Sequence, residues 1–230
     1  LVQDAYNQTG IFAEEEGRSF GAVAALYPEA CQVIVREDAD IQTVEDLQGR
    51  TVSIGAEDSG SEQNARQILA AYGLNDKLVN TVNLNYEDAA AQLRAGKIDA
   101  MLITSGAPST VVAELAGECG IRLLNVDGAA AQRLQSAYSA YNTVTLPAGT
   151  YPGQTEEVHT VGVKAVLLAS ETLPDKQVQA LTELLFANRE ALSRQLGVAL
   201  DPEVDAVEGV GIPFHKGAAA YYKTVGITVE

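Results

Sequence analysis

The chain has 230 residues, and its 31 acidic against 15 basic residues give a formal net charge of −16 at pH 7. Nucleic acids and anionic membrane surfaces are bound through basic patches, so this charge balance argues against both as partners. Apolar residues make up 47 % of the sequence, but no apolar run approaches the ~18 residues that cross a bilayer. We therefore expect a globular chain that forms one large domain or two small lobes.

Two cysteines and two histidines are the residues best suited to bind a transition metal: Cys31, Cys119, His159 and His215. Their wide separation does not match the ligand spacing of a structural zinc site, so the sequence predicts no metal and no cofactor. A single disulfide between Cys31 and Cys119 stays open, but two free, buried thiols are the favoured interpretation.

The first part of the chain contains two extended segments on either side of a proline. A charged turn is expected over 14–18, and residues 22–27 and 32–36 have the apolar and β-branched composition of strands. Pro28 lies between the two segments, and we expect it to mark a bend in a strand that crosses between two lobes. A short helix is predicted next, over 43–49.

A strand, a glycine loop and a helix follow one another over residues 53–69. Ser59 and Glu62 are spaced as a capping box, which predicts a helix that begins after Ser59 and ends at Gly73. Four apolar residues form one stripe on this helix: Ala65, Ile68, Leu69 and Tyr72. Because the N–H groups of a first helical turn can hold a carboxylate or phosphate, the stretch predicts either a capped helix or an anion site.

Strands and helices alternate from residue 51 to residue 126. Short apolar runs predict four strands, over 51–55, 79–84, 98–104 and 121–126. Between them, Asn85 is placed to cap a helix that ends at Gly96, and Pro108 suits the first turn of a helix over 109–116. This alternation favours βαβ units and an open, mostly parallel sheet flanked by helices, which is an α/β fold.

The pattern is less regular beyond residue 128. A helix is predicted over 129–140, strands over 143–147 and 160–169, and a short helix near the end of the chain. Pro174 opens the longest helix, whose expected apolar face consists of Val178, Leu181, Leu185 and Leu192.

Two glycine loops follow predicted strands: Ser59-Gly60-Ser61 and Ser105-Gly106-Ala107. Ligands of open α/β sheets bind beyond the carboxyl ends of the strands, so we expect both loops to line one cleft. Both loops belong to a βα lobe that is predicted over 28–127. Residues 1–27 and 128–230 are expected to form the remainder of the first lobe and the segments that cross the hinge.

Sequence motifs of common catalytic and nucleotide-binding sites are missing from the chain. It has no Gly-x-x-x-x-Gly-Lys-Ser/Thr phosphate loop, no Gly-x-Gly-x-x-Gly fingerprint and no Gly-x-Ser-x-Gly elbow. The sequence thus offers no convincing nucleophile or metal site, and we expect that the chain is not an enzyme. Three acids crowd the first glycine loop, Glu57, Asp58 and Glu62. Together they favour a ligand with both an ammonium and a carboxylate group, although each alone fits a solvated surface charge.

Six segments stand out when the chain is taken in order: 25–29 (ALYPE), 59–66 (SGSEQNAR), 97–100 (KIDA), 104–108 (TSGAP), 147–151 (PAGTY) and 212–222 (IPFHKGAAAYY). Together they resemble the TAXI family of TRAP-transporter solute-binding proteins, and the resemblance covers nearly the whole chain. It implies a two-lobed, periplasmic-binding-protein-like fold of type II topology.

The same resemblance implies a periplasmic solute-binding subunit of a TRAP-type transporter. Such a subunit captures glutamate, glutamine or a dicarboxylate between its two lobes and delivers it to membrane-embedded permease subunits. A ligand-binding sensor domain of a receptor with the same fold is the alternative. Family members carry an N-terminal segment with a Gly-Gly-Thr-type loop, which this chain lacks. We therefore expect a truncated form or a degenerate relative, with any signal peptide outside the sequence.

Eight residues are predicted to line the ligand cleft: Tyr27, Ser59, Gly60, Ser61, Asn64, Ser105, Gly106 and Ala107. We expect the hydroxyl and backbone N–H groups of 59–61 to hold a carboxylate. Asn64 is expected to bind a second polar group of the ligand, and Tyr27 to pack over it. Two weaker candidates are assigned to the other lobe, Gln3 and Tyr151.

Overall fold

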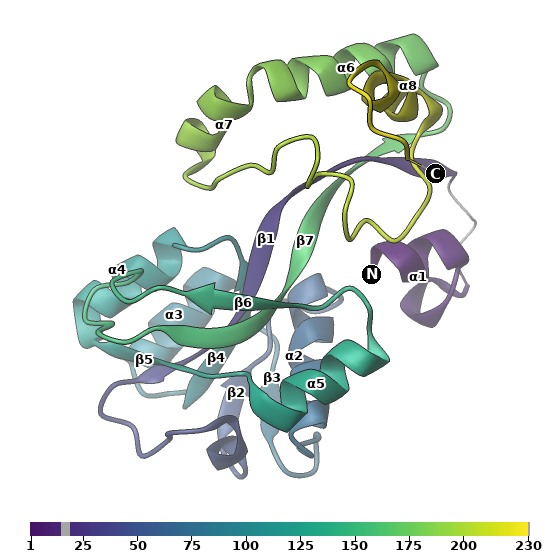
Figure 1. Ribbon diagram of the computed structural model, residues 1–230. Helices are drawn as coiled ribbons and strands as arrows, with labels where there is room; N and C mark the ends of the chain where they lie inside the picture. The colour runs from purple at the N-terminus through teal and green to yellow at the C-terminus, as the bar shows by residue number, and fades with distance from the viewer. Residues whose placement is uncertain (15–18, 230) are drawn as a thin grey trace. The chain divides into compact units, whose positions relative to one another are not determined.

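Residues 1–14 and 19–229 are described by a computed structural model, in which the chain divides into two units (Figure 1). Unit 1 contains Leu1–Tyr27 and Lys164–Glu230, and unit 2 contains Pro28–Val163. The predicted lobe over 28–127 begins at the same residue as unit 2, which also includes 128–163. Most of the expected charged turn, residues 15–18, lies outside the described residues. Within the described part of the chain, no helix is long and apolar enough to cross a membrane.

Two strands, β1 (Phe20–Arg36) and β7 (Val158–Ser170), extend from one unit into the other. The sequence predicts a strand that crosses between lobes at Pro28, and β1 does pass from unit 1 to unit 2 at that residue. The predicted interruption at Pro28 is wrong, because β1 is continuous through it. The fixed φ of proline fits extended backbone, and its missing N–H matters only where a neighbouring strand would accept from it. The ladder between β1 and β4 (Ala100–Ser105) begins at Ala30, beyond the proline.

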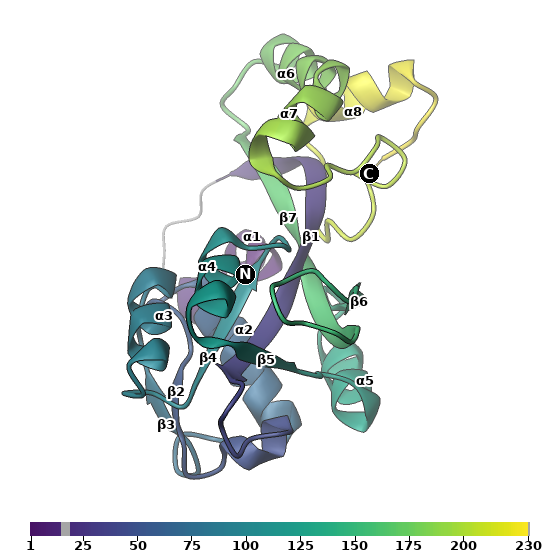
Figure 2. The ribbon, with the colours of Figure 1, turned by 90° about the vertical axis from the view of Figure 1, so that its left-hand side faces the viewer.

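The described residues form a seven-stranded sheet with the order β3-β2-β4-β1-β7-β6, and β5 pairs with β1 (Figure 2). The strands not yet introduced are β2 (Thr51–Ser53), β3 (Asn80–Val82), β5 (Ile121–Leu124) and β6 (Asn142–Leu146). Helices flank this sheet in unit 2, so the predicted α/β class is confirmed.

The sheet contains less parallel pairing than the sequence predicts. Strand β2 pairs in parallel with β3 and with β4, whereas β1 runs antiparallel to β4 and to β5, and β6 runs antiparallel to β7. Val33, Ile34 and Val35 of β1 have partners in both β4 and β5, so β1 lies between those two strands. Strands β4 and β5 do point the same way, as a βαβ unit requires, but the inserted strand runs against both.

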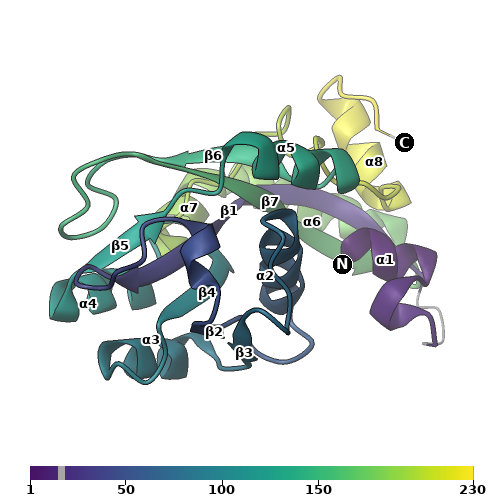
Figure 3. The ribbon, with the colours of Figure 1, turned by 90° about the horizontal axis from the view of Figure 1, so that it is seen from below.

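Four helices cover the two faces of the sheet in unit 2 (Figures 2 and 3). Helices α2 (Gly60–Ala71) and α5 (Gly128–Ala137) pack on one face, over a core that includes Val33 and Val35. Helices α3 (Tyr86–Arg94) and α4 (Thr110–Cys119) pack on the other face, over a core that includes Ile34. Alternate residues of β1 therefore supply both cores, as expected for a strand buried on both sides. A short 3-10 helix, η2 (Val44–Leu47), replaces the helix predicted over 43–49.

Unit 1 contains the helices α1 (Val2–Asn7), η1 (Gly10–Phe12), α6 (Asp175–Ala187), α7 (Arg189–Leu196) and α8 (Lys216–Thr224). The long helix predicted from Pro174 begins there, with Pro174 as the N-cap of α6. Its predicted continuation to Leu192 is wrong, because the backbone breaks between α6 and α7 at Asn188. The Asn188 side chain donates to the Leu184 carbonyl at 2.8 Å, a local bond that competes with helix continuation. Of the predicted apolar face, Val178 is buried but Leu181 is 46 % exposed.

Removing the hydroxyl of Ser53 is expected to stabilise the protein. Ser53 is 1 % exposed and, among the described residues, its Oγ is a buried atom with no hydrogen-bond partner. The strand register places it beside Val82 and Met101, which are apolar. Ser53→Ala should raise the free energy of unfolding in urea by about 1 kcal/mol. Ser61→Ala, which removes a hydrogen-bonded hydroxyl, should lower it. A less stable Ser53→Ala variant would contradict this expectation.

Candidate functional site

The carboxyl ends of β2 and β4 lie side by side, because these strands pair in parallel with Val52 opposite Ala100. The loop after β2 leads to α2, and the loop after β4 leads to α4 through Gly106, Ala107 and Pro108. The sequence predicts Pro108 in the first turn of α4, and this is wrong because Pro108 precedes the N-cap Ser109. The two predicted glycine loops thus follow adjacent strands.

The N-terminus of α2 is capped as the sequence predicts, but its acids have other partners. The Ser59 hydroxyl accepts from the Glu62 N–H at 3.1 Å. The Glu62 carboxylate accepts from the Asp58 N–H at 2.8 Å, and it forms an ion pair with Arg66 at 2.9 Å. Glu57 and Asp58 are exposed. Because Glu62 is neutralised within its own helix, the argument from three free acids to a zwitterionic ligand does not hold.

A first hydrogen-bonded cluster joins α2, α3 and β4 through Ser61, Tyr86 and Thr104. The Tyr86 hydroxyl donates to the Thr104 carbonyl at 2.9 Å and accepts from the Thr104 N–H at 3.2 Å. Ser61 Oγ accepts from the same N–H at 3.3 Å and also contacts the Tyr86 hydroxyl. A carbonyl can only accept, so the single Tyr86 proton is committed to it and Ser61 must donate to Tyr86. The Ser61 proton is therefore used within unit 2.

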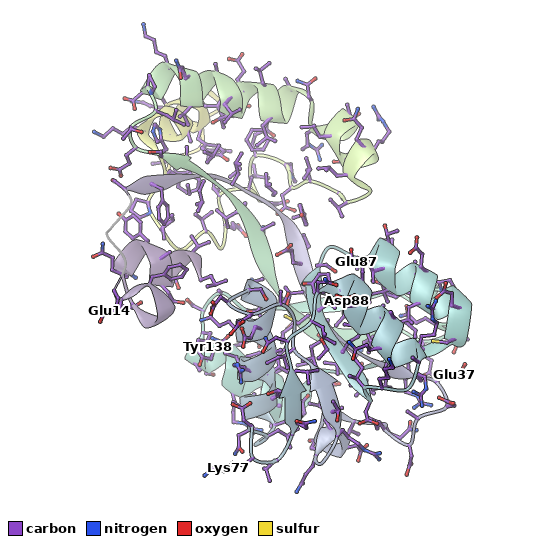
Figure 4. The ribbon with its side chains drawn as sticks, turned by 180° about the vertical axis from the view of Figure 1, so that it is seen from behind. Glu14, Glu37, Lys77, Glu87, Asp88 and Tyr138 are labelled. Atoms are coloured by element: carbon purple, nitrogen blue, oxygen red, sulfur yellow. The ribbon has the colours of Figure 1, made fainter. Side chains whose placement is uncertain are left out.

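The residues beside Tyr86 point elsewhere. Glu87 and Asp88, which follow Tyr86 in the first turn of α3, lie on the exposed side of that helix (Figure 4). Asn85 caps the helix by accepting from the Asp88 N–H at 2.8 Å, as predicted. Tyr86 is thus the residue of this turn that reaches the strand end.

A second cluster surrounds the Thr104 hydroxyl on the α2 side of the sheet. Asn64 Nδ2 donates to Thr104 Oγ1 at 3.1 Å, and Cys31 Sγ lies 3.5 Å from the same oxygen. The Tyr141 hydroxyl lies 2.9 Å from Asn64 Oδ1 and 2.7 Å from Gln67 Oε1. Asn64, which is half-buried, is thus held in place by Thr104 of β4 and by Tyr141, which precedes β6, and it keeps one amide N–H for a further acceptor.

A third cluster lies on the opposite side of β4 and contains Gln32, Tyr151, Ser105 and Ser109. The Tyr151 hydroxyl accepts from the Ser109 N–H at 3.0 Å and donates to Gln32 Oε1 at 2.6 Å. Gln32 Nε2 donates to Ser105 Oγ at 3.3 Å. Gln32 and Tyr151 are buried, each with 2 % of its surface exposed. Tyr151 belongs to unit 2, so its assignment to the lobe opposite the glycine loops is wrong.

Most of the predicted site residues fall in one unit. Seven lie in unit 2 at these strand ends. Besides Asn64, the half-buried residues among the seven are Ser59, Gly60, Ser105, Gly106 and Ala107. Tyr27 belongs to unit 1, as the last residue of its first segment, Leu1–Tyr27. Gln3 also belongs to unit 1, where its amide donates to the Gly211 carbonyl at 3.2 Å. Seven members of the three clusters were not predicted as site residues: Cys31, Gln32, Gln67, Tyr86, Thr104, Ser109 and Tyr141.

The three clusters contain no positively charged side chain. Unit 2 has six arginines and two lysines, and every residue of the unit is described. The arginines bind acids or carbonyls outside the clusters: Arg36, Arg50, Arg66, Arg94, Arg122 and Arg133. Lys77 and Lys97 are exposed and lie before the amino ends of β3 and β4. We call the three clusters, together with Ser59 at the start of α2, the candidate wall. It offers hydroxyl, phenol and amide groups.

Unit 1 contains an open cavity of about 460 Å³. It is lined by Val207, Gly209, Val210, Gly211, Ile212, Pro213, Phe214, Thr228 and Val229. These side chains are apolar apart from Thr228, so the cavity lacks the convergent polar groups that orient a small polar ligand.

Both cysteines are free thiols, Cys31 buried and Cys119 half-buried. Because a buried thiol resists losing its proton, alkaline pH is expected to destabilise unit 2. Burial raises the pKa of the Cys31 thiol from 9.0 to about 12, and burial also raises the pKa of Tyr141 and Tyr151 above 10.0. The unfolded chain loses these protons first, so stability falls as the pH rises above about 9. Burial also raises the pKa of the Cys119 thiol, so Cys31→Ala should make the decline between about pH 9 and about pH 10 shallower in urea unfolding without abolishing it. Coinciding profiles of variant and parent would contradict this.

Several solved structures are similar to the chain at low sequence identity. The periplasmic aliphatic sulphonate binding protein SsuA from Escherichia coli is 19 % identical, with 91 % of this chain aligned to 67 % of that one at a TM-score of 0.47. The P235GK mutant of ArgBP from T. maritima is 15 % identical, with 76 % of this chain aligned to 59 % of that one at a TM-score of 0.43.

A substrate binding protein of an amino acid ABC transporter is 13 % identical, with 75 % of this chain aligned to 61 % of that one at a TM-score of 0.39. The chain thus spans about two thirds or less of each of these proteins, and at such TM-scores they assign it no ligand. The match to a protein family covers more of this chain than the solved structures do. Residues 1–226 match the NMT1-like family, and the chain belongs to that family.

Proposed function

We propose that the protein is an extracytoplasmic solute-binding protein that captures a small carboxylate, either a glutamate-like amino acid or a dicarboxylate. The observation that carries this proposal is the wall of uncharged polar groups at the carboxyl ends of β2 and β4. Ligands of open α/β sheets bind at this edge, and a few convergent polar groups are typical of small-molecule sites. Membership of the NMT1-like family over almost the whole chain agrees with it.

Donors in this wall suit the oxygens of a carboxylate. The half-buried Asn64 has a spare amide N–H, and the Ser59 hydroxyl accepts from Glu62 and so keeps its proton for another acceptor. Both residues lie in or at the first turns of α2, whose positive dipole end adds to the attraction of an anion. The segments that resemble the TAXI family further support a TRAP-type permease as the partner that receives the ligand in the periplasm.

Calorimetric titration with L-glutamate, L-glutamine, 2-oxoglutarate and succinate tests the proposal. Binding of at least one of these compounds is expected, and Asn64→Ala should weaken it by about tenfold because one hydrogen bond is lost. Asn80→Ala is the matched control, since the Asn80 amide donates to Thr51 at the far end of the strands and its loss should leave the affinity unchanged. If none of the four compounds binds, the proposal is wrong.

Salt is expected to have little effect on this affinity. The candidate wall holds no cation whose attraction to an anionic ligand could be screened, and the chain carries a net charge of −16 that repels such a ligand. Raising the NaCl concentration from about 50 to about 500 mM should therefore leave the dissociation constant within about twofold or lower it. A steep loss of affinity with salt would instead require an ion pair with an arginine or lysine.

A further inference from the structure

A directed chain of hydrogen bonds leads from the start of α4 to Ser105. It runs from the Ser109 N–H to the Tyr151 hydroxyl at 3.0 Å, from that hydroxyl to Gln32 Oε1 at 2.6 Å, and from Gln32 Nε2 to Ser105 Oγ at 3.3 Å. A backbone N–H can only donate, so the first bond fixes the direction of the chain. Each group accepts from the one before it and donates to the next.

The opposite orientation of the Gln32 amide is unfavourable. It would present Nε2 to the Tyr151 hydroxyl, which already accepts from Ser109, and would leave the Tyr151 proton without an acceptor. Tyr151 is 2 % exposed, so no bulk water could replace that acceptor. A buried donor without a partner is costly, and this cost selects the orientation in which Gln32 donates to Ser105.

This direction leaves the Ser105 proton unused. Ser105 Oγ accepts from Gln32, and within the described residues its hydroxyl has no bond to a protein acceptor. Ser105 is half-buried and is the last residue of β4, at the strand edge that forms the candidate wall. Ser61 differs, because its proton is committed to Tyr86. Of these two predicted serines, Ser105 is therefore the one that can donate outward.

We propose that Ser105 donates a hydrogen bond to an oxygen of the ligand, and that Tyr151 and Gln32 are positioning residues that set this donor. The proposal rests on the proposed function and adds the chemistry of one contact: the group that lies at Ser105 is a carboxylate or carboxamide oxygen. An ammonium group at that place would leave the Ser105 proton without a partner. The ammonium of an amino-acid ligand is then directed away from the end of β4.

A double-mutant cycle on L-glutamate binding, measured by calorimetry, tests the chain. Ser105→Ala should weaken binding by about tenfold, since a hydrogen bond to a charged oxygen is lost. Tyr151→Phe should weaken it by about three- to tenfold, because the Gln32 amide is then free to turn. The double variant should bind as Ser105→Ala does, since both changes remove the same contact. Gln32→Met, of similar size, breaks the chain at a second point and should match Tyr151→Phe.

Tyr72→Phe is the matched control. The Tyr72 hydroxyl accepts from the Asp127 N–H at 3.1 Å, a bond like that between Tyr151 and Ser109 but with no link to Ser105. This variant should bind L-glutamate with the parental affinity, and thermal unfolding of all variants should be compared alongside. If the losses of Ser105→Ala and Tyr151→Phe multiply in the double variant, the positioning role is wrong. Full affinity of Ser105→Ala overturns the donor role alone, whereas no binding by the parent to any of the four compounds overturns the proposed function as well.

Discussion

Gly55→Ala is expected to lower the free energy of unfolding by about 3 kcal/mol and to abolish tight ligand binding. Gly55 has a φ of +97°, which residues with a Cβ adopt only with strain. A Cβ at this position would lie 2.9 Å from Ser61 Cβ and 3.2 Å from the Glu62 N–H nitrogen. The first turn of α2 would therefore have to move, and Ser61 with it. Because Ser61 joins α2 to Tyr86 and Thr104, the candidate wall would lose its alignment.

Gly73→Ala separates the backbone strain from the collision. Gly73 follows the same helix with a φ of +77°, but a Cβ there would meet nothing within 4 Å. This control should lose only about 1 kcal/mol in urea unfolding and keep its ligand affinity. Equal losses for the two variants would show that the close approach of α2 to Gly55 is unimportant.

Gly217→Ala is expected to destabilise unit 1 by at least about 3 kcal/mol. A Cβ on Gly217 would lie 2.2 Å from the Asp175 carbonyl oxygen and 2.9 Å from the Gln179 nitrogen, so α8 could no longer pack against the start of α6. Helix α8 cannot easily move away. The buried His215 accepts from the Gly217 N–H at 3.0 Å, and the Tyr222 hydroxyl donates to the Val23 carbonyl at 3.0 Å.

Gly117→Ala provides the comparison for a helical glycine. Gly117 lies within α4, and a Cβ there would meet nothing within 4 Å, so the substitution should stabilise unit 2 by about 0.5–1 kcal/mol. Hydrogen exchange followed by mass spectrometry can assign each effect to its unit. Faster exchange is expected in α6 and α8 of Gly217→Ala and not in α4. Unchanged exchange in α6 and α8 would contradict the predicted collision.

Elements with a local signal could be predicted from the sequence. Ser59 and Asn85 accept the N–H groups that their N-cap positions require, and α2 and α3 begin where those residues predict. The insertion of β1 between β4 and β5 has no such signal, because the alternation of strands and helices does not reveal which strands pair. The crossing of β1 at Pro28 was predicted, but its continuity through the proline was not, since the tolerance of a proline depends on what the neighbouring strand accepts.

The candidate site could be predicted only where a residue lies next to a strand end in the sequence. The rule that ligands bind at strand carboxyl ends selected Ser59, Asn64 and Ser105, which all lie at that edge in unit 2. Gln32 and Tyr151 are 119 residues apart and meet only in the folded protein, so no spacing could connect them. The pairing of Glu62 with Arg66, by contrast, was readable as an i, i+4 pair and would have removed the argument for a zwitterionic ligand.

The central claim, that the polar edge of unit 2 binds a small carboxylate, is tested most directly by amide NMR of the isotope-labelled protein titrated with L-glutamate. The largest shift changes are expected at the backbone N–H groups of Gly60, Asn64, Ser105 and Gly106, and at the side-chain amide of Asn64. Shift changes confined to the cavity lined by residues 209–214 of unit 1 would contradict it and would place the binding site elsewhere.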